Sequence, residues 1–426
     1  MTKSYCSKLW DHQYVHMSGS VRFCCATMDN LVDSKGNRMH LNNDSLEKAW
    51  NSKSIREARV KMMRNEPVPE CKKCVLQEAR GYQSMRSLGG ATNNFDNTNE
   101  DGYVQTMPRS MELHLGNVCN LKCKMCGQQY SNQIGKEILE IGESDKDFLQ
   151  WVQRESGNVN IWTNNLSVEY RWFQNQKTKM RLFDYIAKNI TELVVIGGEP
   201  TVIPEFWEMF EYLDTRDKLK DLTITLTTNL TNVNPKLTNW LGKLKKWIIW
   251  ASVDGIGPRT EYIRYPSNWD KVNENLKFYK SNIASNGSIT LSPAIQLLNI
   301  DQLDDILLWW LDFCDGRVDD VFNVSWAAQV SYPTICNYDI APKQYKQFVA
   351  DKLQKSSHKF ADFFWINKFY QSQISNLRND VCEFSNREHF QKAFIRYNDT
   401  QDRHRGKTTW RELLPELEKS LTGSDT

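Results

Sequence analysis

Three closely spaced cysteines constrain this chain more than any other feature. Cys119, Cys123 and Cys126 lie in the run C-N-L-K-C-K-M-C, directly after an apolar-alternating segment that spans Ser110 to Asn117. Each iron of a four-iron cluster normally takes one thiolate, so this loop can hold three of the four irons. The fourth iron has no protein ligand in this segment. Because an open iron can bind and reduce a small molecule, the C-x3-C-x2-C spacing favours catalysis over simple electron carriage.

The length and charge of the chain exclude several classes of protein. With 426 residues it is long enough for a large core and for two or three domains. The 54 basic and 52 acidic residues leave a net charge of +2, which gives no electrostatic case for binding nucleic acid or an anionic membrane. No apolar run is long enough to span a bilayer, and the N-terminus from Met1 to His16 lacks an apolar signal core. We therefore expect a cytoplasmic protein.

The pattern along the chain predicts three regions. Residues 1–107 are polar, turn-rich and contain five cysteines, so a metal is expected to stabilise a segment that can hardly bury enough apolar surface alone. Residues 108–335 alternate strands and helices, with a helical insertion at 132–190, which favours a parallel sheet with crossover helices. Residues 336–426 are predicted to be helical. The expected fold is α/β, a partial (β/α)6 TIM-type barrel with a small N-terminal metal-cluster domain and a C-terminal helical region.

The predicted strands end in polar or unusual residues. The six candidates are Met111–Gly116, Leu193–Gly197, Leu222–Asn229, Trp247–Asp254, Ile289–Gln296 and Val321–Gln329. In a parallel barrel the active site lies at the carboxyl ends of the strands. After the cysteine motif come Gly197-Gly198-Glu199-Pro200, then Asn229, then Ser252-Val253-Asp254-Gly255. Each run alone is typical of a structural turn, and only their joint order favours one shared site.

Together these residues resemble the motifs of the radical S-adenosylmethionine (SAM) superfamily. Cys119, Cys123 and Cys126 match its cluster loop. The run Gly197-Gly198-Glu199-Pro200 is similar to the family's G-G-E-P, which contacts the amino group of SAM. By the same resemblance the further SAM-binding positions are Asn229, Ser252, Asp254, Arg264 and Asn299, with Arg264 matching a position that pairs with the SAM carboxylate. One departure is Met125, where the family often has an aromatic residue, and this puts a stacking contact with adenine in doubt.

The N-terminal cysteines carry a second resemblance, to the twitch or SPASM type of auxiliary-cluster segment. The resemblance implies that Cys6, Cys24, Cys71 and Cys74 hold an auxiliary [4Fe–4S] cluster, and Glu78, Gly81 and Arg86 also fit it. Cys25 competes with Cys24, because neighbouring residues do not easily both bind one compact site. The alternative is a zinc site with C-x2-C spacing, since all-thiolate ligands suit either metal. In the tail, Asp402, Arg403 and Leu414-Pro415-Glu416-Leu417 are also similar to this group.

The resemblance implies a radical SAM enzyme that reductively cleaves SAM to a 5′-deoxyadenosyl radical, which takes hydrogen from a peptide or small-molecule substrate. It further implies an external electron donor of the flavodoxin or ferredoxin type. The alternative is a non-catalytic iron–sulfur or zinc protein that serves as an electron carrier or binding module. The Gly-Gly-Glu-Pro run argues against that alternative, which predicts no cleavage of SAM.

Strand parity suggests which side chains face the substrate. Glu112 and His114 share one face of the first strand, opposite its apolar face, so both are expected to point inward. We take His114, Gln296 and Gln329 as substrate-side groups; the alternative is a polar interior satisfied by its own hydrogen bonds. The three late cysteines (Cys314, Cys336 and Cys382) are expected to be buried small hydrophobic residues. For Cys314 or Cys336 the alternative is donation of a hydrogen atom to a substrate radical.

Overall fold

The computed structural model describes residues 5–79, 84–87, 95–155, 166–282, 285–319, 321–325, 329–330, 333–382 and 384–423. The chain forms two compact units. Unit 1 comprises Met1–Val118, Glu169–Thr227 and Asn234–Trp247, and unit 2 comprises Cys119–Val168, Thr228–Val233 and Ile248–Thr426. The domain boundaries expected at 107/108 and 335/336 do not coincide with this division and stay a prediction.

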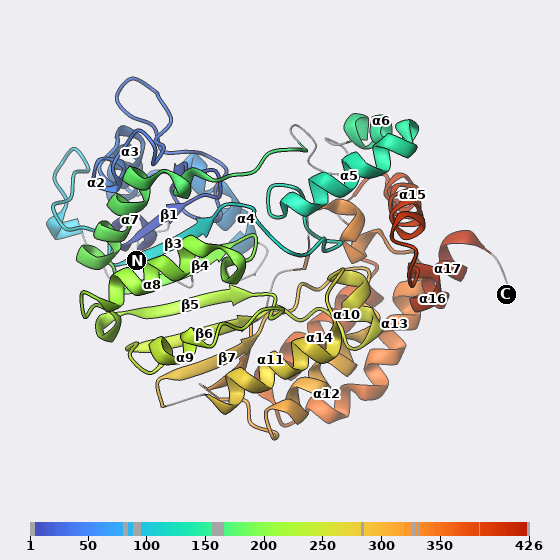
Figure 1. Ribbon diagram of the computed structural model, residues 1–426. Coiled ribbons are helices and arrows are strands. Elements are labelled where there is room, and N and C mark those ends of the chain that lie inside the picture. Colours follow the sequence, from blue (N-terminus) through green and yellow to red (C-terminus); the bar gives the residue numbers. More distant parts are fainter. Residues whose placement is uncertain are drawn as a thin grey trace. The chain divides into compact units, whose positions relative to one another are not determined.

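Eight strands follow the order β2-β1-β3-β4-β5-β6-β7-β8 (Figure 1). Their bounds are β1 His12–Val15, β2 Val21–Arg22, β3 Ser110–Leu115, β4 Glu192–Gly197, β5 Thr223–Thr228, β6 Lys246–Ala251, β7 Gly287–Leu291 and β8 Phe322–Val324. The pairs β1–β3, β3–β4, β4–β5 and β7–β8 are parallel, and β1–β2 is antiparallel. The mixed, mostly parallel sheet with helices confirms the predicted α/β class and is consistent with a partial TIM barrel.

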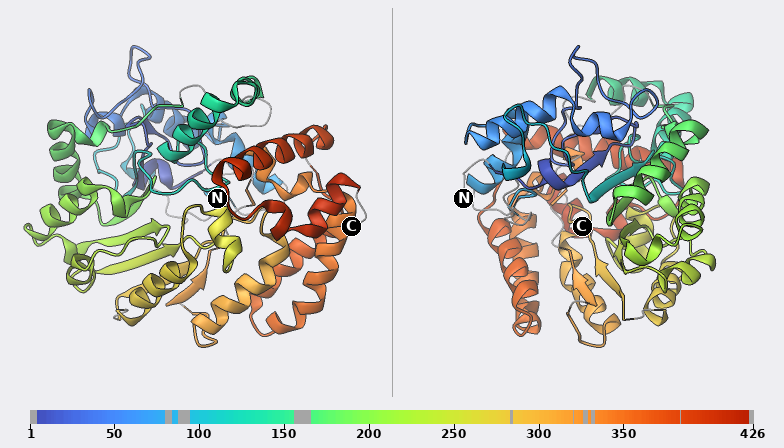
Figure 2. Two further views of the ribbon diagram at one scale, coloured as in Figure 1. Left: turned by 45° about the vertical axis from the view of Figure 1, so that its right-hand side comes forward. Right: turned by 90° about the vertical axis from the view of Figure 1, so that its left-hand side faces the viewer.

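The helices fall between and after the strands. Unit 1 contains α1 Lys8–Asp11, α2 Leu46–Trp50, α3 Lys53–Met63, α4 Lys72–Ala79, α7 Gln176–Asn189, α8 Pro204–Asp214 and α9 Lys236–Leu241. Unit 2 contains α5 Asn132–Ser144, α6 Lys146–Glu155, α10 Pro258–Ile263, α11 Trp269–Ser281, α12 Leu303–Phe313, α13 Lys343–Ser356, α14 Phe364–Arg378, α15 Arg387–Arg405, α16 Trp410–Leu413 and α17 Pro415–Thr422. Figure 2 shows α13 and α14 (orange) packed side by side.

Alternation of burial along the strands separates two faces of the sheet. In β4, Leu193 and Val195 are buried, whereas Val194 and Ile196 keep intermediate exposure. The fully buried positions are apolar, as expected for the face that packs on helices. In the same unit, α7 and α8 contact each other (Figure 1). The register pairs Glu112 with Val194 and His114 with Ile196, so these two polar residues lie on the less buried face.

The N-terminal segment joins the sheet, which the sequence did not predict. The run His12-Gln13-Tyr14-Val15 has no apolar alternation, yet all four residues are buried in β1. This segment also has a buried cation, Arg59, which is 0% exposed and donates to the carbonyls of Leu9, Trp50 and Gly102. Residues 5–79 thus contribute a strand to the sheet and contain a buried, hydrogen-bonded arginine.

Three predicted strands are shorter than the sequence indicated. β6 ends at Ala251, β7 at Leu291 and β8 at Val324. Pro293 lies two residues after the end of β7, and proline cannot donate to a strand ladder. Because the strands end earlier, four predicted site residues lie after the strands and not on them: Ser252, Asp254, Gln296 and Gln329. The argument that Ser252 and Asp254 share a strand face is therefore wrong. Part of the predicted sixth strand, residues 326–328, lies outside the described residues.

Within the part of the chain that the structure describes, no helix combines the length and the apolar character that crossing a bilayer requires.

Candidate functional site

The cysteine loop of unit 2 is buried and held by its neighbours. Cys119 is 9% exposed and Cys123 4%, and Cys126 has intermediate exposure. The Cys119 amide donates to Oδ1 of Asn132 at the start of α5, at 3.2 Å. The Leu121 amide donates to the Cys119 sulfur at 3.4 Å. An amide aimed at a cysteine sulfur stabilises a thiolate, so this donor set fits a metal-bound Cys119.

Two of the three thiols form a pair. A hydrogen bond from Cys126 lowers the pKa of Cys123, and the nearby Arg264 guanidinium lowers it further, although burial opposes both effects. The same hydrogen bond raises the pKa of Cys126 well above its usual value. The pKa values of the two thiols therefore move apart, down at Cys123 and up at Cys126. Metal ligation requires thiolates, and a cation beside the sulfurs lowers the cost of this charge.

Arg264 belongs to a buried network in unit 2. Its Nε lies 2.7 Å from Oδ2 of Asp254, but neither atom has a partner with hydrogen-bond geometry. Oδ1 of Asp254 accepts from the Ala294 amide at 2.7 Å. Burial raises the pKa of Asp254 in spite of the Arg264 charge. The predicted SAM-binding residue Arg264 is thus within ion-pair distance of a second predicted one, and both keep a polar atom that a ligand can engage.

Asn299 and Gln296 lie beside this network. Asn299 is fully buried and its side chain is committed, because it donates to the carbonyls of Asp254 and Ala294 and accepts from the Gln296 amide. The Gln296 side chain is 0% exposed, and neither of its polar atoms has a hydrogen-bond partner. An unpaired buried amide costs free energy, so its presence fits a site that a polar ligand completes.

The remaining predicted residues of unit 2 have local partners. Asn229 donates to Asn120 of the cysteine loop and accepts from Thr231. Gln329 donates to Asn337 and Asp339. The backbone amide of Ser252 donates to the Thr228 carbonyl.

Two of the three late cysteines are buried, whereas Cys382 keeps intermediate exposure, which contradicts the expectation for it. Cys314 is 0% exposed at the end of α12, and Cys336, 2% exposed, donates its thiol to the Lys124 carbonyl at 3.3 Å. Both match the expectation of buried small residues.

In unit 1 the Gly-Gly-Glu-Pro run continues from β4 along the end of β3. The Gly198 amide donates to the Gly116 carbonyl, and the Glu199 amide donates to the Val118 carbonyl. A Cβ on Gly198 would lie 2.1 Å from the Val118 carbonyl oxygen, so only glycine fits this close approach. Glu199 is 1% exposed, and its Oε1 accepts from the Thr201 hydroxyl at 2.7 Å. The run therefore has a structural role that is independent of any cofactor.

The N-terminal cysteines separate into a group of four and one outlier. Charge interactions connect Cys71 with Cys6, Cys24 and Cys74. Cys25 is the most exposed of the five, and its thiol lies within hydrogen-bonding reach of Glu112 instead. This arrangement favours Cys24 over Cys25 as a ligand. Arg86 and Glu78 form an ion pair in the same segment, and Gly81 lies outside the described residues.

His114 lies in a polar cluster with Glu112 and Cys25. Its Nε2 is 2.9 Å from the Glu112 carboxylate, its ring packs 5.1 Å from Tyr14, and its Nδ1 is buried without a hydrogen-bond partner. Glu112 and His114 are 8% and 7% exposed. Glu112 and His114 of this cluster lie on the less buried face of β3.

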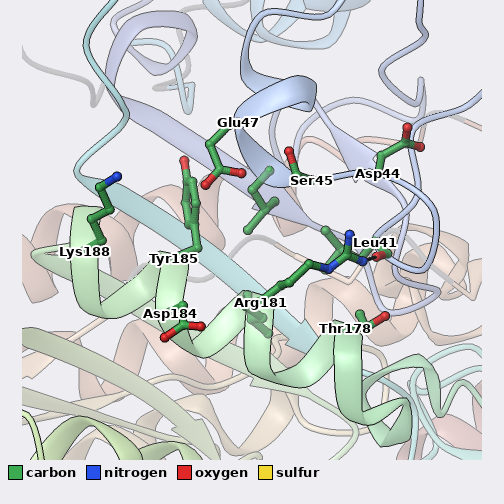
Figure 3. Close-up of a pocket in the computed structure, with 11 residues that line it drawn as sticks. Leu41, Asp44, Ser45, Glu47, Thr178, Arg181, Asp184, Tyr185 and Lys188 are labelled. Atoms are coloured by element: carbon green, nitrogen blue, oxygen red, sulfur yellow. Dashed lines mark hydrogen bonds between the residues drawn. The ribbon is translucent and has the colours of Figure 1, made fainter.

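Figure 3 shows a separate cavity of about 230 Å³ in unit 1, between α7 and the segment that leads into α2. Its lining includes Arg181, Tyr185 and Glu47, and none of the predicted site residues is part of it.

The sequence analysis gave no role to Lys124. This lysine is 2% exposed and lies between two of the cysteines. Lysine is almost always exposed, so composition and spacing contain no signal that it is buried. Its partners Gln401 and Asp402 lie far away in the sequence.

Among the described residues, no group of three or more Cys, His, Asp and Glu side chains is placed to hold one metal ion. Thiolates are ligands for zinc as well as for iron–sulfur clusters, so the geometry of the thiols does not decide between them.

Two protein-family models match this chain, one over the region of the cysteine loop and one over the N-terminal cysteines. The model described as the radical SAM superfamily matches residues 113–309. The model described as SPASM, an iron–sulfur cluster-binding domain, matches residues 6–75. The chain thus contains a radical SAM domain and an N-terminal SPASM domain. The cofactors of these domains are SAM and [4Fe–4S] clusters.

Some solved structures with bound SAM are similar at low identity. Native anSMEcpe with bound AdoMet shares 16% identity over 59% of this chain and 60% of that chain, with a TM-score of 0.32, and its complex with the Cp18Cys peptide gives the same values. SuiB of Streptococcus suis bound to S-adenosylmethionine shares 14% identity over 84% of this chain and 68% of that chain, with a TM-score of 0.33. These scores are too low to carry an argument, and the match spans only about three fifths of anSMEcpe. The comparison with curated proteins gave no match.

Proposed function

We propose that this radical SAM protein reductively cleaves SAM and uses the resulting radical to take hydrogen from a peptide or small-molecule substrate. The observation that supports this most is the buried loop with three thiols beside the Arg264 guanidinium. When bound, the cluster and SAM supply a 5′-deoxyadenosyl radical and methionine. An external donor of the flavodoxin or ferredoxin type supplies the electron.

Each predicted residue has a proposed role in binding. Cys119, Cys123 and Cys126 hold the SAM cluster, and Cys6, Cys24, Cys71 and Cys74 hold the auxiliary cluster. The residues proposed to bind SAM are Gly197, Gly198, Glu199, Asn229, Ser252, Asp254, Arg264 and Asn299. For Gly198 and Asn299 the structure already gives a structural role, so their contribution is to shape the site. Arg264 can pair with a carboxylate through the part of its guanidinium that Asp254 does not engage.

The substrate-side groups are proposed to be His114, Gln296 and, with weaker support, Gln329. Gln296 supports the proposal because both polar atoms of its buried amide lack a partner. His114 supports it because Nδ1 is free while Nε2 is held by Glu112. Gln329 is engaged by Asn337 and Asp339. His114→Ala tests the first assignment: unchanged turnover and unchanged substrate affinity would show that His114 has no such role.

We also propose that the protein works in the cytoplasm. All eleven cysteines are free of disulfides, and reduced thiols persist in the reducing environment of that compartment.

The experiment is anaerobic incubation with SAM and dithionite, with 5′-deoxyadenosine measured by mass spectrometry. The proposal predicts 5′-deoxyadenosine from the wild type and none above background from Cys123→Ala. A protein with both clusters but no 5′-deoxyadenosine would instead support the non-catalytic iron–sulfur alternative. Once cleavage is established, transfer of deuterium from labelled candidates into 5′-deoxyadenosine identifies the substrate.

A further inference from the structure

Several backbone amides and carbonyls of the cysteine loop, Cys119–Cys126, are hydrogen-bonded by other parts of unit 2. At its start, the Ser131 hydroxyl donates to the Leu121 carbonyl at 2.6 Å. In the middle, the amides of Lys122 and Lys124 donate to the carbonyls of Tyr265 and Ile263, at 2.6 and 2.8 Å. These contacts come from the residues before α5 and the end of α10. They fall within the segment that the radical SAM family model matches.

A second set of contacts comes from α15, far outside that matched segment. The Arg405 guanidinium donates to the Lys122 carbonyl at 2.9 Å. The same guanidinium pairs with the Glu137 carboxylate at 2.8 and 2.9 Å, and the side chains of Arg405 and Glu137 are only 4% and 0% exposed. Arg405 therefore connects the loop, α5 and the last turn of α15 through one buried ion pair.

Lys124 inserts into a cage formed largely by the same helix. Its Nζ donates to Oε1 of Gln401 at 3.0 Å and to Oδ1 of Asp402 at 3.1 Å, and it lies 4.4 Å from the centre of the Tyr262 ring. The Lys124 and Asp402 side chains are 1% and 4% exposed. A buried lysine is costly unless it is paired and hydrogen-bonded, so Asp402 fixes the position of the residue that follows Cys123.

Asp402 is itself fixed by two further donors. The Tyr262 hydroxyl donates to its carboxylate at 3.0 Å, and the Trp410 amide donates to Oδ2 at 2.9 Å. Gln401 is 0% exposed and donates to Glu137 at 3.0 Å. The polar groups on this face of α15 thus form one connected network, in which Nη1 of Arg405 is the atom left without a hydrogen-bond partner.

We propose that the C-terminal end of α15, through Asp402 and Arg405, positions the cysteine loop and keeps it in its ligating shape before any cluster is bound. This rests on the proposed function, in which the loop holds the SAM cluster. Asp402 and Arg405 are positioning residues that act through Lys124 and Lys122 and touch no reacting atom. The C-terminal region is then part of the cluster site and not a separate substrate-recognition module.

The matched variants are Asp402→Asn and Asp399→Asn in the full-length chain. Asp399 lies on the same helix but pairs with Arg411 and Trp410 instead of the loop. Hydrogen exchange of the peptide Cys119–Cys126 is measured in protein from which the clusters have been removed. We expect Asp402→Asn to speed exchange of this peptide by about tenfold or more, because a buried lysine loses its ionic partner. Asp399→Asn should leave it unchanged.

A second readout uses the loaded protein. The SAM cluster is recognised as the one whose EPR spectrum changes on addition of SAM. In Asp402→Asn a chelator should remove this cluster about tenfold faster than in the wild type, because Lys124 has lost its ionic partner. The auxiliary cluster should be kept. If Asp402→Asn gives too little protein, Arg405→Lys replaces it, because lysine keeps the charge but loses the second N–H that reaches Lys122.

Two results would overturn the proposal. One is that the peptide Cys119–Cys126 of cluster-free Asp402→Asn exchanges its amide hydrogens as slowly as that of the wild type. The other is exchange that rises by the same factor in the loop and in α12, which would make α15 a general support of unit 2. If the loop responds as expected but no cluster responds to SAM, the proposed function fails and the positioning role of α15 stands.

Discussion

The two cysteine groups differ in how their charges are balanced. In unit 2, three thiols come from one short loop, with Arg264 and Arg405 contributing positive charge near Cys123. In unit 1, four thiols come from three separate segments, and burial raises the pKa of Cys6 to about 11 and of Cys71 to about 12. Arg86 is the cation that acts on Cys71. The difference indicates a loop arranged in advance for an incomplete cluster and a second set that depends on its metal.

The largest expected effect separates the two groups by function. Cys123→Ala removes one of the three proposed ligands of the loop cluster, so 5′-deoxyadenosine formation should fall to background. Iron should drop from about eight to about four per chain, since only one of two four-iron clusters is lost. Iron analysis and mass spectrometry on anaerobic protein check this. Retention of about eight irons would show that the loop does not bind a cluster.

The adjacent cysteines Cys24 and Cys25 test the second group. Cys24→Ala should lose the auxiliary cluster, leaving about four irons per chain, whereas Cys25→Ala should keep about eight. The reason is that Cys24 interacts with Cys6 and Cys74, while the Cys25 thiol faces Glu112. The reverse result would exchange the roles of these two neighbours.

The next largest effect concerns the stability contributed by the ion pair between Arg405 and Glu137, next to the cysteine loop. Glu137→Gln leaves Arg405 buried without its charged partner and should cost about 3 kcal/mol of unfolding free energy. Urea denaturation of cluster-free protein measures it. The matched control is Glu140→Gln on the same helix, because Glu140 is 53% exposed and its contact with Lys122 at 3.8 Å is solvent-screened. Equal effects of the two variants would argue against a rigid loop support.

The smallest effect concerns unit 1 and pH. Burial lowers the pKa of His12 from 6.5 to about 3, so the folded state keeps this imidazole neutral. The stabilisation is complete above pH 6.5 and is lost as pH falls toward 3, since the unfolded chain binds the proton first. At pH 5 the loss should be about 2 kcal/mol. Urea titrations at pH 7 and pH 5 should show it, and His12→Asn should reduce the difference.

The local motifs were predictable from the sequence because their spacing is short-range. The cysteine loop and the Gly-Gly-Glu-Pro run at the end of β4 both follow from patterns within about a dozen residues. The predicted strand at Ile289–Gln296 was too long because an apolar run does not show where Pro293 ends the ladder.

The contacts that hold the site were not predictable in the same way. Lys124 meets Gln401 and Asp402 across more than half of the chain, and nothing near Lys124 in the sequence marks it as buried. β1 was missed because His12 and Gln13 have no apolar pattern, although the fold buries both. Arg264 was expected to face SAM, and its proximity to Asp254 became visible only in the structure.

The central claim is that the loop cluster has an open iron and the N-terminal cluster does not. The most direct measurement is EPR of the anaerobically reduced protein with and without SAM, in the wild type and in Cys24→Ala. The account predicts two reduced-cluster signals, of which one changes on addition of SAM and persists in Cys24→Ala. No change in either signal, or a SAM-dependent signal that disappears with Cys24→Ala, would contradict it.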